Sequence, residues 1–186
     1  MLARPLLLLA LALLPAAPAL ADEYADALKS FRNAGQSAEF FKKAHGYALF
    51  PTIGKGGVGL GAAHGSGRVY EKGKHIGDTT MTQVSVGLQL GGQAFSQIIF
   101  FEDERALKEF TSGNFEFGAE ASAVAITAAA GAQAGTGGAS AGASGGRNDA
   151  ATVGKYYKGM ATFTIAKGGL MYQAAIGGQK FSYKAR

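Results

Sequence analysis

The chain has 186 residues, and its 18 Lys and Arg residues outnumber its 13 Asp and Glu residues, giving a net charge of +5. It contains no cysteine, which excludes disulfide bonds, and three histidines without cysteine argue against a structural zinc site. The weak positive charge forms no basic run, which argues against nucleic acid as a partner and leaves anionic lipids or envelope polymers.

The first 21 residues have the three-part pattern of a secretory signal peptide. Arg4 supplies a positive charge, residues 6–14 form an unbroken apolar run, and residues 19–21 (Ala-Leu-Ala) form a cleavage site. The run is far shorter than the roughly 20 residues that cross a bilayer as a helix. We therefore expect cleavage after Ala21, a periplasmic or secreted location, and a single domain over residues 22–186 with a net charge of +4.

Two helices are predicted at the start of this domain. Apolar residues recur at helical spacing through residues 22–34, and Gly35 ends that helix. Ser37 is predicted to cap a second helix over residues 38–45, which Gly46 ends.

Glycine-rich strands follow. Residues 47–50 are predicted as a short strand closed by Pro51. The glycines of residues 54–59 match a dinucleotide-binding fingerprint, but that fingerprint needs a helix directly after it. Residues 57–62 instead alternate glycine with apolar residues, which favours a strand whose glycine face is approached closely by another group. Residues 64–67 are predicted as a turn, and no nucleotide site is expected.

The second half of the chain continues with strands at hairpin spacing. These strands are predicted over residues 84–92, 96–101, 160–165, 170–175 and 179–183. A short helix is predicted over residues 103–110, with the acids of 102–104 at its start acting as a cap. Residues 115–130 fit either a helix or a strand, and residues 131–148 are predicted as a flexible loop rich in Gly, Ala and Ser.

Together these elements predict an α+β fold. Its main part is a strongly curved, barrel-like antiparallel sheet of about eight strands, because strands dominate, hairpin spacing recurs and βαβ units are absent. Two N-terminal helices and one short inserted helix complete it.

No set of residues in the sequence points to catalysis. The Gly-Lys pairs at residues 54–55, 73–74 and 154–155 lack the hydroxyl residue and the upstream glycine of a phosphate-binding loop. No nucleophile has a base and an orienting partner in a recognisable pattern. We therefore expect neither an enzyme nor a bound cofactor or metal ion.

The ordered motifs resemble the SYLF domain family. They are GYALFP at 46–51, KGGVGLG at 55–61, VGLQLG at 86–91, IIFF at 98–101 and FGAEAS at 117–122, and the resemblance covers most of residues 22–183. It implies membrane lipid binding without catalysis. Eukaryotic members resemble phosphoinositide binders that use a basic amphipathic N-terminal segment, and some also contact actin. A predicted signal peptide takes that place here, which argues against actin and phosphoinositides and favours the anionic phospholipid that secreted bacterial members imply.

We therefore expect peripheral, non-enzymatic binding of anionic membrane phospholipid headgroups in the cell envelope. Aromatic rings would enter the headgroup boundary beside cations that meet lipid phosphate. The predicted lipid-binding residues are Lys29, Phe31, Arg32, Phe40, Phe41, Lys42 and Lys43. Alternatively, the phenylalanines pack the helices onto the sheet. An integral outer-membrane β-barrel and a structural envelope protein without a small ligand remain alternative functions.

Overall fold

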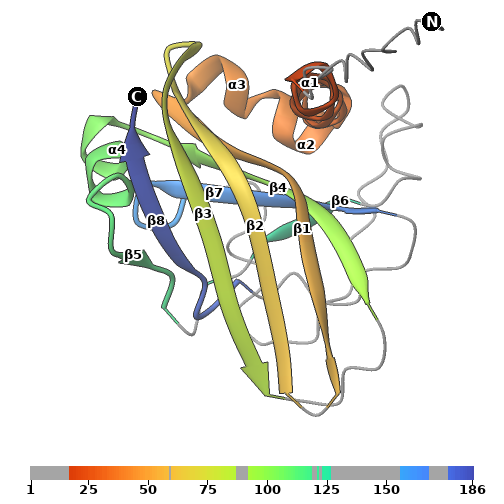
Figure 1. Cartoon of the computed structure of the whole chain (residues 1–186). Coiled ribbons are helices and arrows are strands. Elements are labelled where there is room, and N and C mark those ends of the chain that lie inside the picture. Colours follow the sequence, from red (N-terminus) through yellow and green to blue (C-terminus); the bar gives the residue numbers. More distant parts are fainter. Residues whose placement is uncertain are drawn as a thin grey trace, which may run out of the picture.

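The structure is a computed structural model, and it describes residues 17–58, 60–86, 92–118, 121, 123–126, 156–167 and 176–186. Figure 1 shows a strongly curved sheet with three helices packed near one end of it and a fourth helix beside the strand at the C-terminus. This arrangement confirms the predicted α+β fold with a strongly curved sheet.

The sheet has eight strands in the order β5-β8-β3-β2-β1-β4-β7-β6. All neighbouring pairs are antiparallel except β6 and β7, which are parallel, so the antiparallel prediction fails at that edge. The strands are β1 Gly46–Val58, β2 Leu60–Glu71, β3 Lys74–Val86, β4 Gln93–Phe101, β5 Phe115–Glu116, β6 Val124–Ile126, β7 Met160–Lys167 and β8 Lys180–Ala185.

The helices are α1 Ala17–Asn33, α2 Gly35–Ala38, α3 Phe40–Lys43 and α4 Glu104–Phe110. Of the second helix predicted over residues 38–45, only the single turn α3 forms, the separate turn α2 precedes it, and Ser37 caps neither. Ser37 lies buried inside α2, where its hydroxyl donates a hydrogen bond to the Phe31 carbonyl oxygen at 2.6 Å. Ser37 therefore joins α2 to the C-terminal end of α1 and does not cap a helix.

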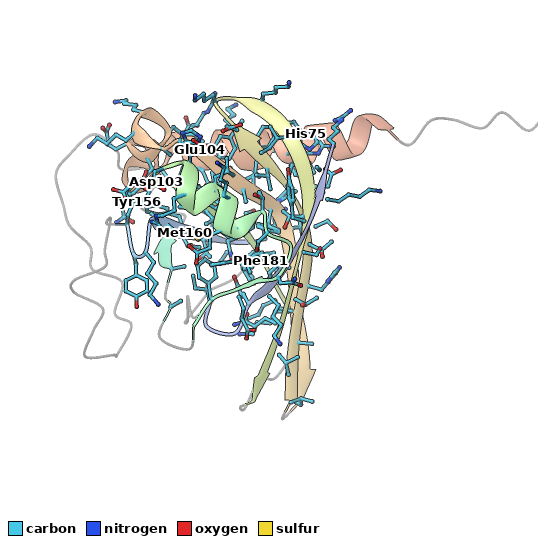
Figure 2. The ribbon with its side chains drawn as sticks, turned by 90° about the vertical axis from the view of Figure 1, so that its left-hand side faces the viewer. His75, Asp103, Glu104, Tyr156, Met160 and Phe181 are labelled. Atoms are coloured by element: carbon cyan, nitrogen blue, oxygen red, sulfur yellow. The ribbon has the colours of Figure 1, made fainter. Side chains whose placement is uncertain are left out.

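The predicted cap of α4 is confirmed. The Asp103 carboxylate accepts a hydrogen bond from the backbone N–H of Ala106 at 2.8 Å, and Glu104 begins the helix beside it (Figure 2). This bond satisfies one of the amide groups that have no partner in the first turn of a helix.

The hairpin of β1 and β2 differs from the prediction. Pro51 lies inside β1, where the pairing shifts register between Leu49 and Thr52, a position that tolerates a residue without an N–H donor. Val58 pairs with Leu60, so the chain reverses there, and residues 64–67 lie within β2 instead of forming the turn. Alternation of glycine and apolar residues on both sides of a tight turn looks like one continuous strand in the sequence.

Two hydrophobic cores lie on the two faces of the sheet. The inner core joins the sheet to α4, and its large members include Phe50, Ile53, Ile99, Phe101, Phe110 and Phe181. The outer core joins the sheet to α1, α2 and α3, and its large members include Phe31, Phe40, Leu49, Ile98, Phe100 and Phe163. Successive residues of β1 and β4 alternate between the cores because side chains along a strand point to opposite faces.

Glycines on β2 make room for large side chains of β1. A Cβ atom at Gly65 would lie 2.6 Å from Cγ1 of Ile53, and one at Gly67 would lie 2.6 Å from the Phe50 ring. At Gly57, a Cβ atom would lie 2.1 Å from the Leu60 carbonyl oxygen. The expected close approach to glycine is therefore confirmed at Gly57 and also occurs farther along β2, whereas Gly59 lies outside the described residues.

Candidate functional site

The structure places two of the three predicted lipid-binding phenylalanines in the outer core. Phe31 is fully buried and Phe40 is 9% exposed. The Phe40 ring centroid lies 5.5 Å from that of Phe100 and 5.0 Å from that of Phe163. These rings hold the helices against β4 and β7, so the described fold does not present them to a membrane, and the packing alternative applies to both.

Phe41 lies at the edge of the same core and is partly buried. Its ring packs edge-on against Phe100, with 4.8 Å between centroids, and the Arg32 guanidinium carbon lies 5.3 Å from its ring centre. This cation–π contact links the end of α1 to α3.

All four predicted cations are exposed on the helices: Lys29, Arg32, Lys42 and Lys43. We call these four residues the helical cations. Lys42 forms an ion pair with Glu39 at 2.9 Å, and the hydrogen bond that its ammonium group donates lowers the pKa of the Glu39 carboxyl. The other three form no ion pair with any residue in the described part of the chain. Three of the four charges are therefore exposed without an ion pair in the described ranges, although the charge of Lys43 also contributes to the lowered pKa of Glu39.

Polar contacts also join the N-terminal half of α1 to the sheet. The Thr52 hydroxyl of β1 hydrogen-bonds to the Glu23 carboxylate, and Lys167 of β7 donates to Thr52 at 2.6 Å. The Thr52 hydrogen bond, followed by the contacts of Lys167, lowers the pKa of Glu23. On the other side of α1, the Arg68 guanidinium carbon of β2 lies 4.1 Å from the ring centre of Tyr24.

The structure has a second exposed surface that the sequence did not predict. It lies where β1, β2 and β3 end away from the helices, and we call residues 54–58, 60–64 and 82–86 the distal end. Leu60 is 61% exposed and Val84 is 69% exposed, the largest exposed fractions among the large hydrophobic residues that the structure describes. The sequence carried a signal for it, because residues 53–67 and 79–101 contain no Asp or Glu.

Away from the distal end, His45 and His75 contact charged side chains of the fold. His45 lies 2.8 Å from the Glu71 carboxylate, and His75 lies 3.0 Å from both Asp78 and the Arg186 guanidinium group. Among the described residues, no three His, Asp or Glu side chains are grouped so that they could hold a metal ion. Nor does any helix in the described ranges combine the length and apolar character needed to cross a bilayer.

Comparison with known proteins gives a family and one curated relative. A family model described as "Las17-binding protein actin regulator" (Ysc84) matches residues 82–184, more than half of the chain. Beta cell expansion factor A of Aeromonas veronii is 28% identical over 158 residues, which cover 83% of this chain and 51% of that protein. The chain therefore spans about half the length of this relative. On the family match, the chain belongs to the Ysc84 family of SYLF-domain proteins, as its ordered motifs predicted.

Proposed function

We propose that this chain binds anionic phospholipid at a membrane surface, peripherally and without catalysis. Membership of a family described by what it binds supports a binding function. The observation that carries the proposal is the exposure of all four helical cations on helices held by buried aromatic rings. Cations fixed in this way meet lipid phosphates without first having to order a flexible segment.

The attraction in this proposal is electrostatic. A Lys or Arg near an anionic bilayer contributes about 1 kcal/mol of attraction, and the attraction falls off within a Debye length of about 8 Å at physiological ionic strength. Four such charges give moderate, salt-sensitive binding. The rings of Phe31 and Phe40 act indirectly, because they fix the helices that carry the charges.

We further propose that the ligand is a lipid of the cell envelope and that actin is not a partner of this chain. Both points depend on export, for which the evidence is the signal-peptide pattern of residues 1–21. The expected mature chain begins at Asp22. Intact mass spectrometry of the exported protein measures this directly, and an uncleaved N-terminus would remove the reason for setting actin aside.

Reversing two neighbouring charges tests the lipid surface. Lys42→Glu/Lys43→Glu is expected to weaken binding to vesicles of phosphatidylglycerol and phosphatidylcholine by roughly tenfold or more, and the effect should shrink at high salt. The matched control is Lys108→Glu/Lys184→Glu, which changes the net charge equally at exposed positions of α4 and β8. Sedimentation with vesicles measures binding, and circular dichroism checks the fold of each variant.

The control separates a local contact from the effect of net charge. If both double variants weaken binding equally, total charge and not the helical surface attracts the lipid. If the folded Lys42→Glu/Lys43→Glu variant sediments as well as wild type does, these two lysines do not bind the membrane.

A further inference from the structure

The distal end projects beyond the rest of the described chain. Both figures show β1, β2 and β3 extending past the other strands on the side away from α1, α2 and α3. β1 has 13 residues, so a rise of about 3.3 Å per residue makes it about 40 Å long, and the distal end lies at the end of β1 away from α1, α2 and α3. The distal end is therefore a separate surface.

Three exposed apolar side chains of the distal end lie on one face of the sheet, whereas Ala63 belongs to the inner core on the other face. Leu60 pairs with Val86 and Ala62 pairs with Val84, so Val84 lies directly opposite Ala62 and diagonally opposite Leu60, and all three are exposed. On the neighbouring strand β1, a Cβ atom added at Gly54 or Gly56 would meet nothing within 4 Å. Within the described ranges, this face therefore offers aliphatic groups, open backbone and the exposed polar side chains of His64 and Thr82, and no helix covers it.

The ionisable residues near the distal end indicate what kind of partner it can bind. Residues 53–67 and 79–101 have only Lys55 and His64 as ionisable side chains, whereas the whole chain has 13 Asp and Glu residues. A carboxylate carried into a bilayer is costly, while aliphatic side chains enter it favourably and a lysine can reach the phosphates. The absence of carboxylates fits an anionic or zwitterionic lipid surface. Lys55 adds a positive charge at the same end but on the opposite face of the sheet, because it pairs with Ala63 of the inner core.

A protein partner fits this face less well. Specific protein interfaces bury about 800 Å² on each partner, and three aliphatic side chains supply only a small part of that area. The backbone of β2 is already paired on both sides, with β1 and with β3, so it cannot accept an added strand. A bilayer needs neither shape complementarity nor backbone pairing.

We propose that the distal end inserts Leu60 and Val84 into the boundary between the headgroups and acyl chains of a bilayer. The inference rests on the proposed function in that the partner is a membrane, but it adds a second contact of a different kind. The helical cations attract the phosphates, whereas the distal end enters the apolar layer and should act on neutral lipid as well.

The absence of cysteine makes direct labelling possible. Single variants Leu60→Cys and Val84→Cys carry an environment-sensitive NBD fluorophore, and Lys184→Cys is the labelled control at an exposed position of β8. On phosphatidylcholine vesicles at high salt, the first two probes should shift to the blue and be quenched by nitroxide-labelled lipid. The control probe should do neither.

Binding variants complement the probes. Leu60→Thr/Val84→Thr should weaken binding to phosphatidylcholine vesicles by about tenfold or more, because it removes the aliphatic groups from an exposed face without changing the charge. Ala62→Leu at the neighbouring position should strengthen it. Both changes lie at exposed positions, so circular dichroism should show an unchanged fold.

The outcomes separate this inference from the proposed function. Probes that stay unshifted while the protein still binds anionic vesicles overturn the insertion and leave the helical surface intact. Inserted probes combined with wild-type binding by Lys42→Glu/Lys43→Glu support the insertion and overturn the helical surface. A wild-type protein that binds no vesicle overturns both. A lipid-free dimer that Leu60→Thr abolishes assigns the face to a second copy of the chain and overturns the insertion.

Discussion

Gln97 and Gln179 donate amide hydrogen bonds to each other inside the inner face of the sheet. The Gln97 amide nitrogen lies 2.8 Å from the Gln179 amide oxygen, the reverse bond is 3.1 Å long, and neither residue is exposed. Gln97 belongs to β4 and Gln179 directly precedes β8, strands with three others between them in the sheet order. The pair therefore joins distant parts of the sheet across its curve.

Replacing one glutamine of this pair leaves the other without a partner. The two single replacements together should therefore lower the free energy of unfolding by more than the double replacement does. Gln97→Met or Gln179→Met alone leaves a buried amide without its partner and should lower the free energy of unfolding by about 1–3 kcal/mol. The double variant should be less destabilised than the sum of the single variants, because no amide is left alone. Urea unfolding measures all four proteins of this cycle. Additive effects would show that the two amides do not stabilise each other.

The glycine at position 67 should tolerate no side chain. Gly67→Val should destabilise the fold by about 1–3 kcal/mol or more, because its Cβ atom would overlap the Phe50 ring in a packed core. Gly54→Val is the matched control, since a Cβ atom there meets nothing within 4 Å. Thermal unfolding compares the two. Equal melting temperatures for both variants would mean that the Phe50 ring moves aside without cost.

Glu23 should make the free energy of unfolding depend on pH in the acidic range. Its pKa in the folded protein is lowered, first by the Thr52 hydrogen bond and then by Lys167. The stabilisation is therefore present above the ordinary glutamate pKa near 4.5 and is lost as the pH falls through the lower folded value. Glu23→Gln should lose less stability than wild type does between neutral pH and this acidic range. Parallel pH profiles from urea unfolding would exclude this role for Glu23.

Tyr156 carries a hydroxyl group that is buried and has no hydrogen-bond partner among the described residues. Burial raises its pKa to about 12, so its contribution to stability is present below the ordinary tyrosine pKa of 10 and is lost as the pH rises towards 12. Tyr156→Phe keeps the ring that packs against Phe40 and should be at least as stable at neutral pH. Among the described tyrosines, it should also remove the last phenol to ionise in an ultraviolet titration. A clear loss of stability at neutral pH would indicate that the hydroxyl has a partner.

The sequence predicted the helices and strands better than it predicted which side chains pack against one another. The apolar stripe of α1 and the Asp103 cap were readable because each depends on residues within a few positions of one another. The burial of Phe40 was not, because a phenylalanine beside lysines gives the same pattern whether it faces lipid or a neighbouring strand. Its burial depends on Phe100 and Phe163, which are far away in the chain.

The distal end went unnoticed for a related reason. Leu60 and Val84 each belong to a regular alternation, and alternation does not show which face a helix covers. The reversal at Val58 places Leu60 diagonally opposite Val84, and it could not be read from a run of glycine and apolar residues without a change of pattern.

The two cores also bear on how the chain finds its register. In most sheets a slip of one residue is prevented because it turns apolar side chains towards water, but here both faces of β1 and β4 are apolar near the helices. A slip of one residue would move Leu49 into the inner core and Phe50 into the outer core. Because both cores are apolar, such a slip would expose no apolar side chain to water. Available volume opposes it instead, because the Phe50 ring fits over Gly67, where no side chain occupies the space. In this sheet the glycines of β2 set the alignment by leaving room for one arrangement and not for its neighbours.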